Sequence, residues 1–322
     1  MNAQAKTIGN VPMPPMIEAN AHLGDRQALH ALMDREGYLF FRDVLDQDAI
    51  GEIKRAYMKV LTDMGVVDAG ATEPVWNGAD LTNFPVKFEQ LHEVKVWERF
   101  AEHPKINAFF RELLGDDPFW LPIVEYRIFP PLAKAPEDPF FGRHQDGFYN
   151  GDLDCWTCWV PLVDVNADTG GLAMASGQHK RGYLHDVNAP PQYYIPGDAI
   201  PSESWRRSEY KPSDVVVFNR WIPHCGMDNF SKHFRMSMDI RVMPVSGDLP
   251  VWGKVQTFTP SEISVQNHDG KLVSLRVDDE TYSRWTGGKR IATEELIALI
   301  PPGDDVLAFH KDGHATMLRP PR

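Results

Sequence analysis

The sequence lacks the features that mark most secreted and membrane-spanning proteins. Only three of its 322 residues are cysteine. Cys155 and Cys158 lie three positions apart in a strand-like run, which turns their side chains to opposite faces and disfavours a mutual disulfide. No apolar run approaches the roughly 20 residues of a membrane span, and residues 1–15 have no apolar centre like that of a signal peptide. We therefore expect a cytoplasmic protein with reduced cysteines and no membrane association.

An excess of basic charge is also missing. The chain has 33 lysines and arginines against 45 acidic residues, a formal net charge of −12. Nucleic-acid binders need clustered cations that displace counterions from phosphates, so we expect no nucleic-acid partner. Hydrophobic residues make up 43% of the chain and charged residues 24%, which is typical of a globular protein with a large core.

Helical and strand-like patterns divide the chain near Gly115. Before it, the patterns predict a short strand over 37–41 and helices over 27–35, 46–61 and 104–114. After it, short runs of β-branched and aromatic residues predict strands over 120–129, 155–163, 171–175, 214–218 and 234–243. This spacing is typical of a barrel or sandwich, and a closed barrel or jelly roll has an interior that can hold a small molecule.

The domain organisation is predicted from the same patterns. We expect residues 1–24 to form a flexible arm and residues 25–245 to form the main domain. Residues 246–322 would form an extension that packs on the core as a lid or a subunit contact, and a homodimer is left open. Within this extension we expect strands over 255–258 and 272–276, a helix over 293–299, and a basic, proline-rich tail.

Three residues could hold a metal ion. In extended chain, His144 and Asp146 point the same way, so an imidazole and a carboxylate can reach one ion. The same pair also arises by chance in turns whose Asp accepts backbone hydrogen bonds. An apolar run from Asp214 leads into His224, which completes a set of two histidines and one carboxylate. Such a set suits a non-haem Fe(II) with open positions, although zinc would also accept it.

A carboxylate-binding pair follows the third of these residues. Arg235 comes eleven residues after His224, and Ser237 lies on the same face of the predicted strand. A guanidinium and a hydroxyl can jointly bind a carboxylate, and a buried arginine without an anion is costly. The far carboxylate of 2-oxoglutarate would suit this pair. A cupin-like metal-binding barrel without catalysis would have no need of it.

These motifs resemble the phytanoyl-CoA dioxygenase family of Fe(II)- and 2-oxoglutarate-dependent oxygenases. The resemblance covers roughly Gly37 to Met243 and rests on five passages: Gly37–Leu45, His144-x-Asp146, Trp159–Leu162 with Asp168–His179, His224, and Arg235-x-Ser237. The sequence departs from the family at Gln178, where relatives usually have Ser. His179 is expected to be structural, and His185 is expected at the surface.

The resemblance implies a fold, a reaction and a set of roles. The fold would be a double-stranded β-helix, mainly β with flanking helices. His144, Asp146 and His224 would be the catalytic metal ligands, Arg235 with Ser237 would bind 2-oxoglutarate, and Arg127 would add a further polar contact to it. Fe(II), 2-oxoglutarate and O2 would be required, and ascorbate would help in vitro.

The reaction implied is oxidation of a C–H bond, usually hydroxylation, with release of succinate and CO2. Desaturation, epoxidation or rearrangement would use the same site, and so would halogenation, although a halogenase lacks the carboxylate that Asp146 provides. The aromatic residues Phe148, Tyr149 and Trp221 flank the metal motifs and line either the substrate pocket or the general core. An acidic protein does not invite a coenzyme A thioester, so we expect a free small molecule from secondary metabolism or an amino-acid derivative.

Overall fold

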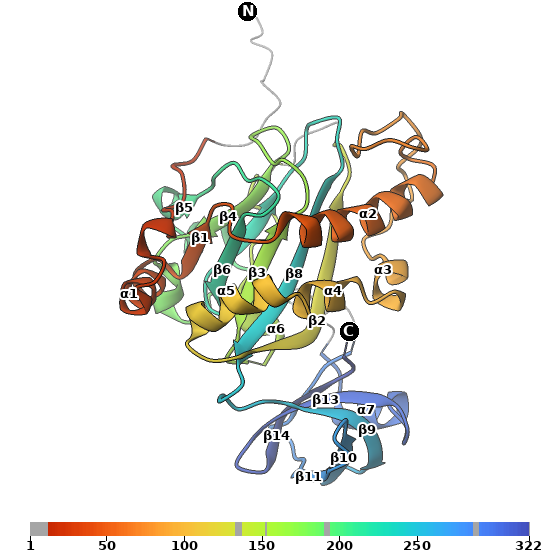
Figure 1. The fold of residues 1–322 in the computed structure, drawn as a ribbon. Helices are drawn as coiled ribbons and strands as arrows, with labels where there is room; N and C mark the ends of the chain where they lie inside the picture. Colours follow the sequence, from red (N-terminus) through yellow and green to blue (C-terminus); the bar gives the residue numbers. More distant parts are fainter. Residues whose placement is uncertain (1–11, 133–136, 152, 190–193, 286–289, 322) are drawn as a thin grey trace, which may run out of the picture.

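A β-barrel covered by helices on one side makes up most of the molecule, and a smaller unit of C-terminal strands lies beneath it (Figure 1). The computed structural model describes residues 12–132, 137–151, 153–189, 194–285 and 290–321. The helices are α1 (Arg26–Glu36), α2 (Gln47–Asp63), α3 (Glu89–Glu93), α4 (Val96–Ala101), α5 (Pro104–Leu114), α6 (Asp146–Tyr149) and α7 (Thr293–Leu299).

The strands form three sheets. The strands of the barrel are β1 (Tyr38–Phe41), β2 (Pro118–Phe129), β3 (Trp156–Pro161), β4 (Gly171–Ala175), β5 (Trp205–Arg206), β6 (Val215–Asn219), β7 (His224–Met227) and β8 (Arg235–Pro244). Those of the C-terminal unit, defined here as residues 251–319, are β9 (Val251–Phe258), β10 (Glu262–Asn267), β11 (Leu272–Arg276), β12 (Tyr282–Ser283), β13 (Asp305–Lys311) and β14 (His314–Arg319).

The barrel is the predicted double-stranded β-helix. Its large sheet has the strand order β1-β6-β3-β8-β2 and its small sheet the order β5-β4-β7, and all of these pairings are antiparallel. The rings of Phe218 on β6 and His224 on β7 lie 4.7 Å apart, so the two sheets face each other across the interior. A ligand site between the sheets is therefore accessible to side chains of both.

Strand β8 shows why the large sheet has one apolar and one polar face. Polar and apolar residues alternate from Arg235 to Val242, and Met236, Met238, Ile240 and Val242 all belong to the main hydrophobic core. That core lies between the sheet and helices α1, α2, α4 and α5 (Figure 1). Because side chains alternate across a strand, the polar residues of β8 point the other way, into the barrel; they are Arg235, Ser237, Asp239 and Arg241.

The helices of the first part begin and end where capping residues require it. Asp46 accepts hydrogen bonds from the N–H groups of Asp48 and Ala49 at the start of α2. Gly37 and Gly115 end α1 and α5 in the left-handed conformation, which glycine adopts without strain. The predicted helices and strands of this part are confirmed to within a few residues.

The C-terminal unit contains the predicted strands and helix, as parts of β9, β11 and α7, but its last segment differs from the prediction. Strand β11, at one end of the six-stranded sheet, also pairs with β14, so the sheet closes on itself. The segment after α7, which was expected to be a basic, proline-rich tail, forms β13 and β14, and Ala315, Met317 and Leu318 of β14 are fully buried. The basic and proline-rich composition of this segment did not indicate β14, because this strand is stabilised by its pairing with β13 and not by a pattern of its own.

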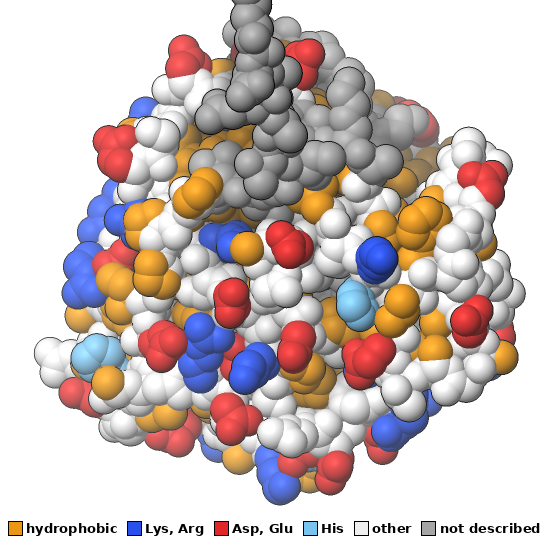
Figure 2. All heavy atoms as spheres, turned by 90° about the horizontal axis from the view of Figure 1, so that it is seen from above, with side chains coloured by type: hydrophobic (Ala, Val, Ile, Leu, Met, Phe, Trp, Pro, Cys, Tyr) orange, Lys and Arg blue, Asp and Glu red, His pale blue; other side chains and the backbone are white. Residues whose placement is uncertain are grey.

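The folded part of the chain also starts earlier than expected. Met16 and Ala19 are buried, and Ala19 N–H donates to Phe40 O. The contact lies within the expected flexible arm, of which residues 1–11 lie outside the described residues. In the parts that the structure describes, no helix is long and apolar enough to cross a membrane. Acidic and basic side chains are interspersed on the face seen from above (Figure 2).

Candidate active site

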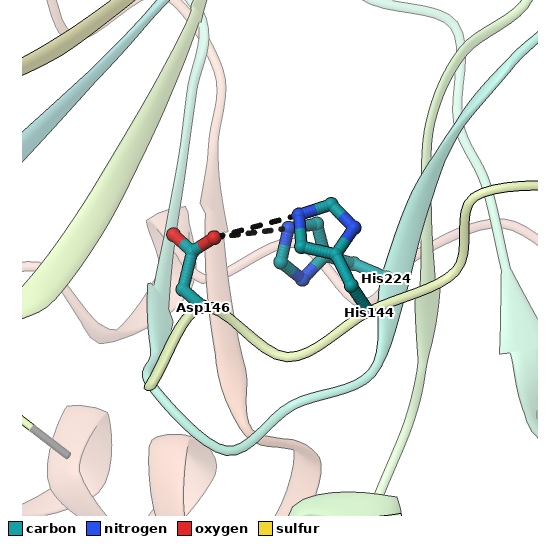
Figure 3. A group of neighbouring side chains, drawn as sticks. All are labelled: His144, Asp146 and His224. Carbon is teal, nitrogen blue, oxygen red and sulfur yellow. Dashed lines mark ion pairs between the residues drawn. The ribbon is translucent and has the colours of Figure 1, made fainter. Parts of the chain in front are cut away.

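The side chains of His144, Asp146 and His224 point toward one another (Figure 3). Asp146 Oδ1 lies 3.5 Å from His144 Nε2 and 3.7 Å from His224 Nε2. One candidate ligand atom from each residue lies within 4.8 Å of the others. The three residues come from α6, the loop before it and β7, so the fold brings together the set that the sequence predicted.

Backbone pairing holds the two histidines side by side. His144 N–H donates to His224 O, and His224 N–H donates to His144 O, each at 2.9 Å. Each imidazole also has its Nδ1 near a carbonyl two residues earlier, Gly142 O at 2.9 Å and Ile222 O at 3.1 Å. With Nδ1–H donating there, Nε2 carries the lone pair that a metal needs.

The two carboxylate oxygens of Asp146 have different neighbours. Oδ2 accepts from Thr157 Oγ1 at 2.6 Å and from Arg241 Nη2 at 2.8 Å, whereas Oδ1 faces the histidines. Burial opposes ionisation of Asp146, but the Arg241 guanidinium and a hydrogen bond with His144 hold its pKa well below the usual range. Burial and the neighbouring His144 lower the pKa of His224 to about 3. The site therefore contains an ionised carboxylate beside a neutral His224 imidazole, the protonation states that metal binding requires.

A glycine, Gly226, lies close to Arg235 on the strand that carries His224. Gly226 lies on the same face of β7 as His224, roughly 6 to 7 Å further along the strand, and it is exposed between the buried residues Cys225 and Met227. A Cβ at Gly226 would lie 3.1 Å from Arg235 Nη2. A side chain at this position would therefore press against the guanidinium of Arg235.

Arg235 is a buried cation at the start of β8. Its guanidinium is 4.0 Å from the centre of the Phe129 ring, and Nη1 donates to the carbonyls of Thr169 and Met227. Nε and the hydroxyl of Ser237 are buried without a hydrogen-bond partner among the described residues. Burial lowers the pKa of Arg235 to about 10. A buried guanidinium that meets only neutral oxygens calls for an anion, so the residues fit a bound 2-oxoglutarate.

Arg127 is already engaged by another carboxylate. It lies opposite Ser237 in the β2–β8 pairing, and its Nε donates to Asp239 Oδ2 at 3.1 Å. A third of its side chain, 33%, is accessible to solvent inside the barrel. Arg127 therefore lines the interior, and its contact with 2-oxoglutarate stays a prediction.

The three aromatic residues lie close to the metal ligands in sequence and differ in their contacts. The Tyr149 ring centre is 6.0 Å from that of His144, and the Phe148 ring stacks on His185 at 3.9 Å. Trp221 packs under the guanidinium of Arg220, and its carbonyl accepts from Gln145 Nε2. All three are partly exposed, as pocket-lining residues would be.

Sequence reasoning missed several supporting residues. His185 was expected at the surface, which is wrong: it is buried, and its Nε2 accepts the N–H of Gln145, the residue between two metal ligands. His179 is structural as expected, with Nε2 3.0 Å from Asp34 O. Thr157 and Arg241, which hold Asp146, were not singled out as supports of the metal site. The alternation of β8 was the one signal that could have placed Arg241 inside the barrel.

A site of two histidines and one carboxylate inside a double-stranded β-helix defines the class of non-haem iron oxygenases. The phytanoyl-CoA dioxygenase (PhyH) family model matches residues 33–237, a range that contains all three ligands, Arg235 and Ser237. The chain belongs to this family of iron- and 2-oxoglutarate-dependent dioxygenases, as its motifs predicted.

Three individual proteins that resemble this chain are less than 30% identical to it. The 1-deoxypentalenic acid 11-beta-hydroxylase of Streptomyces exfoliatus is 29% identical over 245 residues, which cover 71% of this chain and 85% of the relative. A structure of EctD from S. alaskensis with bound Fe is 21% identical, covers 74% of this chain and 83% of its own, and has a TM-score of 0.49. A structure of the epimerase SnoN with Fe3+, alpha ketoglutarate and nogalamycin RO is 22% identical, covers 69% and 84%, and has a TM-score of 0.47.

Proposed function

We propose that this dioxygenase hydroxylates a C–H bond of a free small organic molecule, with His144, Asp146 and His224 as its iron ligands. Bound iron with 2-oxoglutarate and O2 supplies the oxidising chemistry, and 2-oxoglutarate leaves as succinate and CO2. The chain's own residues hold and orient the reactants. Arg241 and Thr157 fix the metal carboxylate, while Arg235 and Ser237 bind the far carboxylate of 2-oxoglutarate.

The burial of Arg235 without an ion pair among the described residues is the main support for a 2-oxoglutarate site at this position. Arg235 is 2% exposed, and a Cβ on Gly226, which shares a face of β7 with His224, would lie 3.1 Å from its Nη2. No carboxylate lies within ion-pair distance of it in the described part of the chain. A barrel that merely stored a metal would have no use for a buried guanidinium at this place, since the charge costs desolvation free energy.

The substrate class follows from the relatives and the wall of the site. The Streptomyces exfoliatus relative is named for hydroxylation of 1-deoxypentalenic acid. Phe148, Tyr149 and Trp221 would give the pocket an aromatic surface that suits an apolar or cyclic skeleton. The net charge of −12 disfavours the phosphates of a coenzyme A thioester. Hydroxylation is preferred to halogenation because Asp146 occupies the position that a halide would need.

The test is succinate formation by the purified apo-protein. We expect succinate only when Fe(II) and 2-oxoglutarate are supplied together with O2, and faster release when the substrate is present. Screening carboxylic acids of natural-product type for this acceleration, followed by mass analysis for one added oxygen, would identify the substrate. Equal activity with zinc alone would overturn the assignment in favour of a hydrolytic site.

A further inference from the structure

The C-terminal unit packs against the chain segment that carries the metal carboxylate. Residues 147–155 connect Asp146 to β3, which carries Thr157, the residue that donates to Asp146 Oδ2. An apolar cluster joins this segment and the barrel strands to the C-terminal unit; its buried members are Leu121, Ile123, Leu153, Cys155, Met243, Leu307, Phe309 and Met317. A Cβ on Gly151 would lie 3.1 Å from Met317 Sδ. This contact is a packed hydrophobic interface, unlike that of a lid that opens in each cycle.

Two arginines of the C-terminal unit reach the end of α6. Arg284 Nη1 donates to both Tyr149 O and Asn150 Oδ1. Arg319 Nη1 donates to the same Asn150 oxygen at 3.4 Å. The N–H of Asn150 in turn donates to Asp146 O at 3.1 Å. A continuous set of hydrogen bonds thus leads from the C-terminal unit to the residue that would bind iron.

Helix α6 needs such support because it is too short to hold itself. It has four residues, and a single turn fixes several dihedral angles for very few hydrogen bonds. Asp146 is its first residue, so any rotation of the turn would move the carboxylate. The guanidinium of Arg284 contacts the last carbonyl of the turn and the side chain that follows it. Its planar, rigid donor geometry makes this contact directional.

The environment of Arg284 indicates that the contact serves geometry more than stability. The residue is 7% exposed, both of its acceptors are neutral, and Nε has no partner among the described residues. Burial lowers the pKa of this guanidinium. Removing the Arg284 guanidinium from water costs free energy, and hydrogen bonds to neutral acceptors offset only part of this cost. Net stabilisation of the fold therefore does not explain why a buried arginine occurs at this position.

We propose that Arg284 is a positioning residue for the metal ligand Asp146, and that the C-terminal unit is a fixed wall of the active site. The inference rests on the proposed metal site. It concerns a residue outside the range matched by the family model, 33–237, so family membership does not assign the role. The unit then acts within the same chain and closes the barrel at the end remote from Arg235.

The test compares metal affinity with 2-oxoglutarate affinity in the full-length protein. Arg284→Gln is titrated with Co(II), whose absorption reports binding, and with 2-oxoglutarate at saturating Fe(II) without O2. Loss of a group that orients a metal ligand typically weakens metal binding about 10- to 100-fold, and we expect a change of this size. The 2-oxoglutarate affinity should stay within about twofold of the wild-type value, because Arg235 lies at the other end of β8. Arg276→Gln, on the exposed β11 of the same unit, is the control and should change neither value.

Variants of Asn150 separate positioning from folding. Asn150→Ala removes the shared acceptor without removing a charge and should also weaken Co(II) binding. Asn150→Asp supplies a carboxylate between the two guanidiniums and should keep the wild-type metal affinity. Wild-type Co(II) affinity in both Arg284→Gln and Asn150→Ala, at a temperature where both are folded, would overturn the inference. Failure of the wild-type protein to bind Co(II) would instead overturn the proposed metal site.

Discussion

Arg241 Nη2 lies 2.8 Å from Asp146 Oδ2, on the oxygen that does not face the two histidines. Thr157 donates to the same oxygen. The two contacts leave Oδ1 as the oxygen directed at the shared space, so Asp146 would bind a metal through one oxygen. Both partners are buried, and a buried ion pair has a strict geometry because neither charge has water as an alternative partner.

Replacing Arg241 by Met should therefore weaken metal binding and the fold together. We expect Co(II) affinity to fall about 10- to 100-fold and stability to fall by about 3 to 5 kcal/mol, since the change leaves a buried charge uncompensated. Co(II) titration and chemical unfolding measure the two effects. Arg276→Met, which alters an exposed arginine, is the control. If stability falls but Co(II) affinity does not, Arg241 supports only the fold.

The assignment of the 2-oxoglutarate anchor can be tested by comparing two arginines. Arg235→Ala should reduce 2-oxoglutarate affinity by about 2 to 5 kcal/mol, the usual cost of truncating one partner of a buried charge pair, and leave Co(II) binding unchanged. Arg127→Ala should have a smaller effect because Asp239 already neutralises Arg127. Anaerobic titration of the Fe(II) protein measures both. A larger loss in Arg127→Ala would move the anchor to Arg127.

Most of the fold could be predicted because its elements are locally encoded. Helices α5 and α7 and strands β4 and β11 have the predicted bounds, since caps, turn residues and periodicity agree there. Strand β7 was not predicted as such, because Pro223 precedes it and the exposed Gly226 interrupts its four residues. It exists through its pairing with β4 and with His144. The final strand β14 likewise depends on a partner strand rather than on its own pattern.

The metal ligands could be predicted because their motif is compact in sequence. The residues that support these ligands could not be predicted, because they are distant from them in sequence. His144 and Asp146 are two residues apart, whereas Arg241 reaches Asp146 only through the register of β8 with β3. His185 contacts Gln145 through a loop that returns to the metal site, which no local pattern reveals. The positions of Arg284 and Asn150 depend on docking of the C-terminal unit, for which the sequence carries no signal that we recognised.

Glu36 should make stability depend on pH. Burial alone would raise its pKa, but hydrogen bonds from Ser176 Oγ and Arg35 Nε hold its pKa below the ordinary value. The ionised form therefore favours the folded state above the unfolded pKa of about 4.3, and this contribution is lost as the pH falls through the lower folded pKa. Glu36→Gln should cost about 1.5 to 3 kcal/mol at pH 7, and the difference should shrink near pH 3.5.

Unfolding midpoints in urea at the two pH values measure this difference. Glu52→Gln, which changes an exposed glutamate on α2, is the control and should show little difference at either pH. Should Glu36→Gln cost the same at pH 7 and pH 3.5, the pKa of Glu36 is the same in the folded and the unfolded protein, and the predicted lowering of its pKa is wrong.

A methyl group can be added at Gly226 without replacing any charged residue. A Cβ there would lie 3.1 Å from Arg235 Nη2 and 3.6 Å from Phe129 Cζ, and the backbone is not in the left-handed region that alanine avoids. Gly226→Ala should therefore fold normally and bind Co(II) as the wild type does, but it should displace the guanidinium and occupy part of the co-substrate space. We expect 2-oxoglutarate affinity to fall about tenfold or more, the equivalent of about 1.4 kcal/mol.

Gly247→Ala is the matched control, because a Cβ at Gly247 would also lie 3.1 Å from a side-chain atom, Met243 Cε, in a loop that contributes no residue to the metal or 2-oxoglutarate site. It should leave 2-oxoglutarate affinity unchanged, so a loss confined to Gly226→Ala would reflect the position of the methyl group and not crowding in general. Wild-type 2-oxoglutarate affinity in Gly226→Ala, with Co(II) binding intact, would mean that the co-substrate does not pass over Gly226. The carboxylate would then have to be bound elsewhere on the inner face, where Arg127 is the remaining solvent-accessible guanidinium of β2.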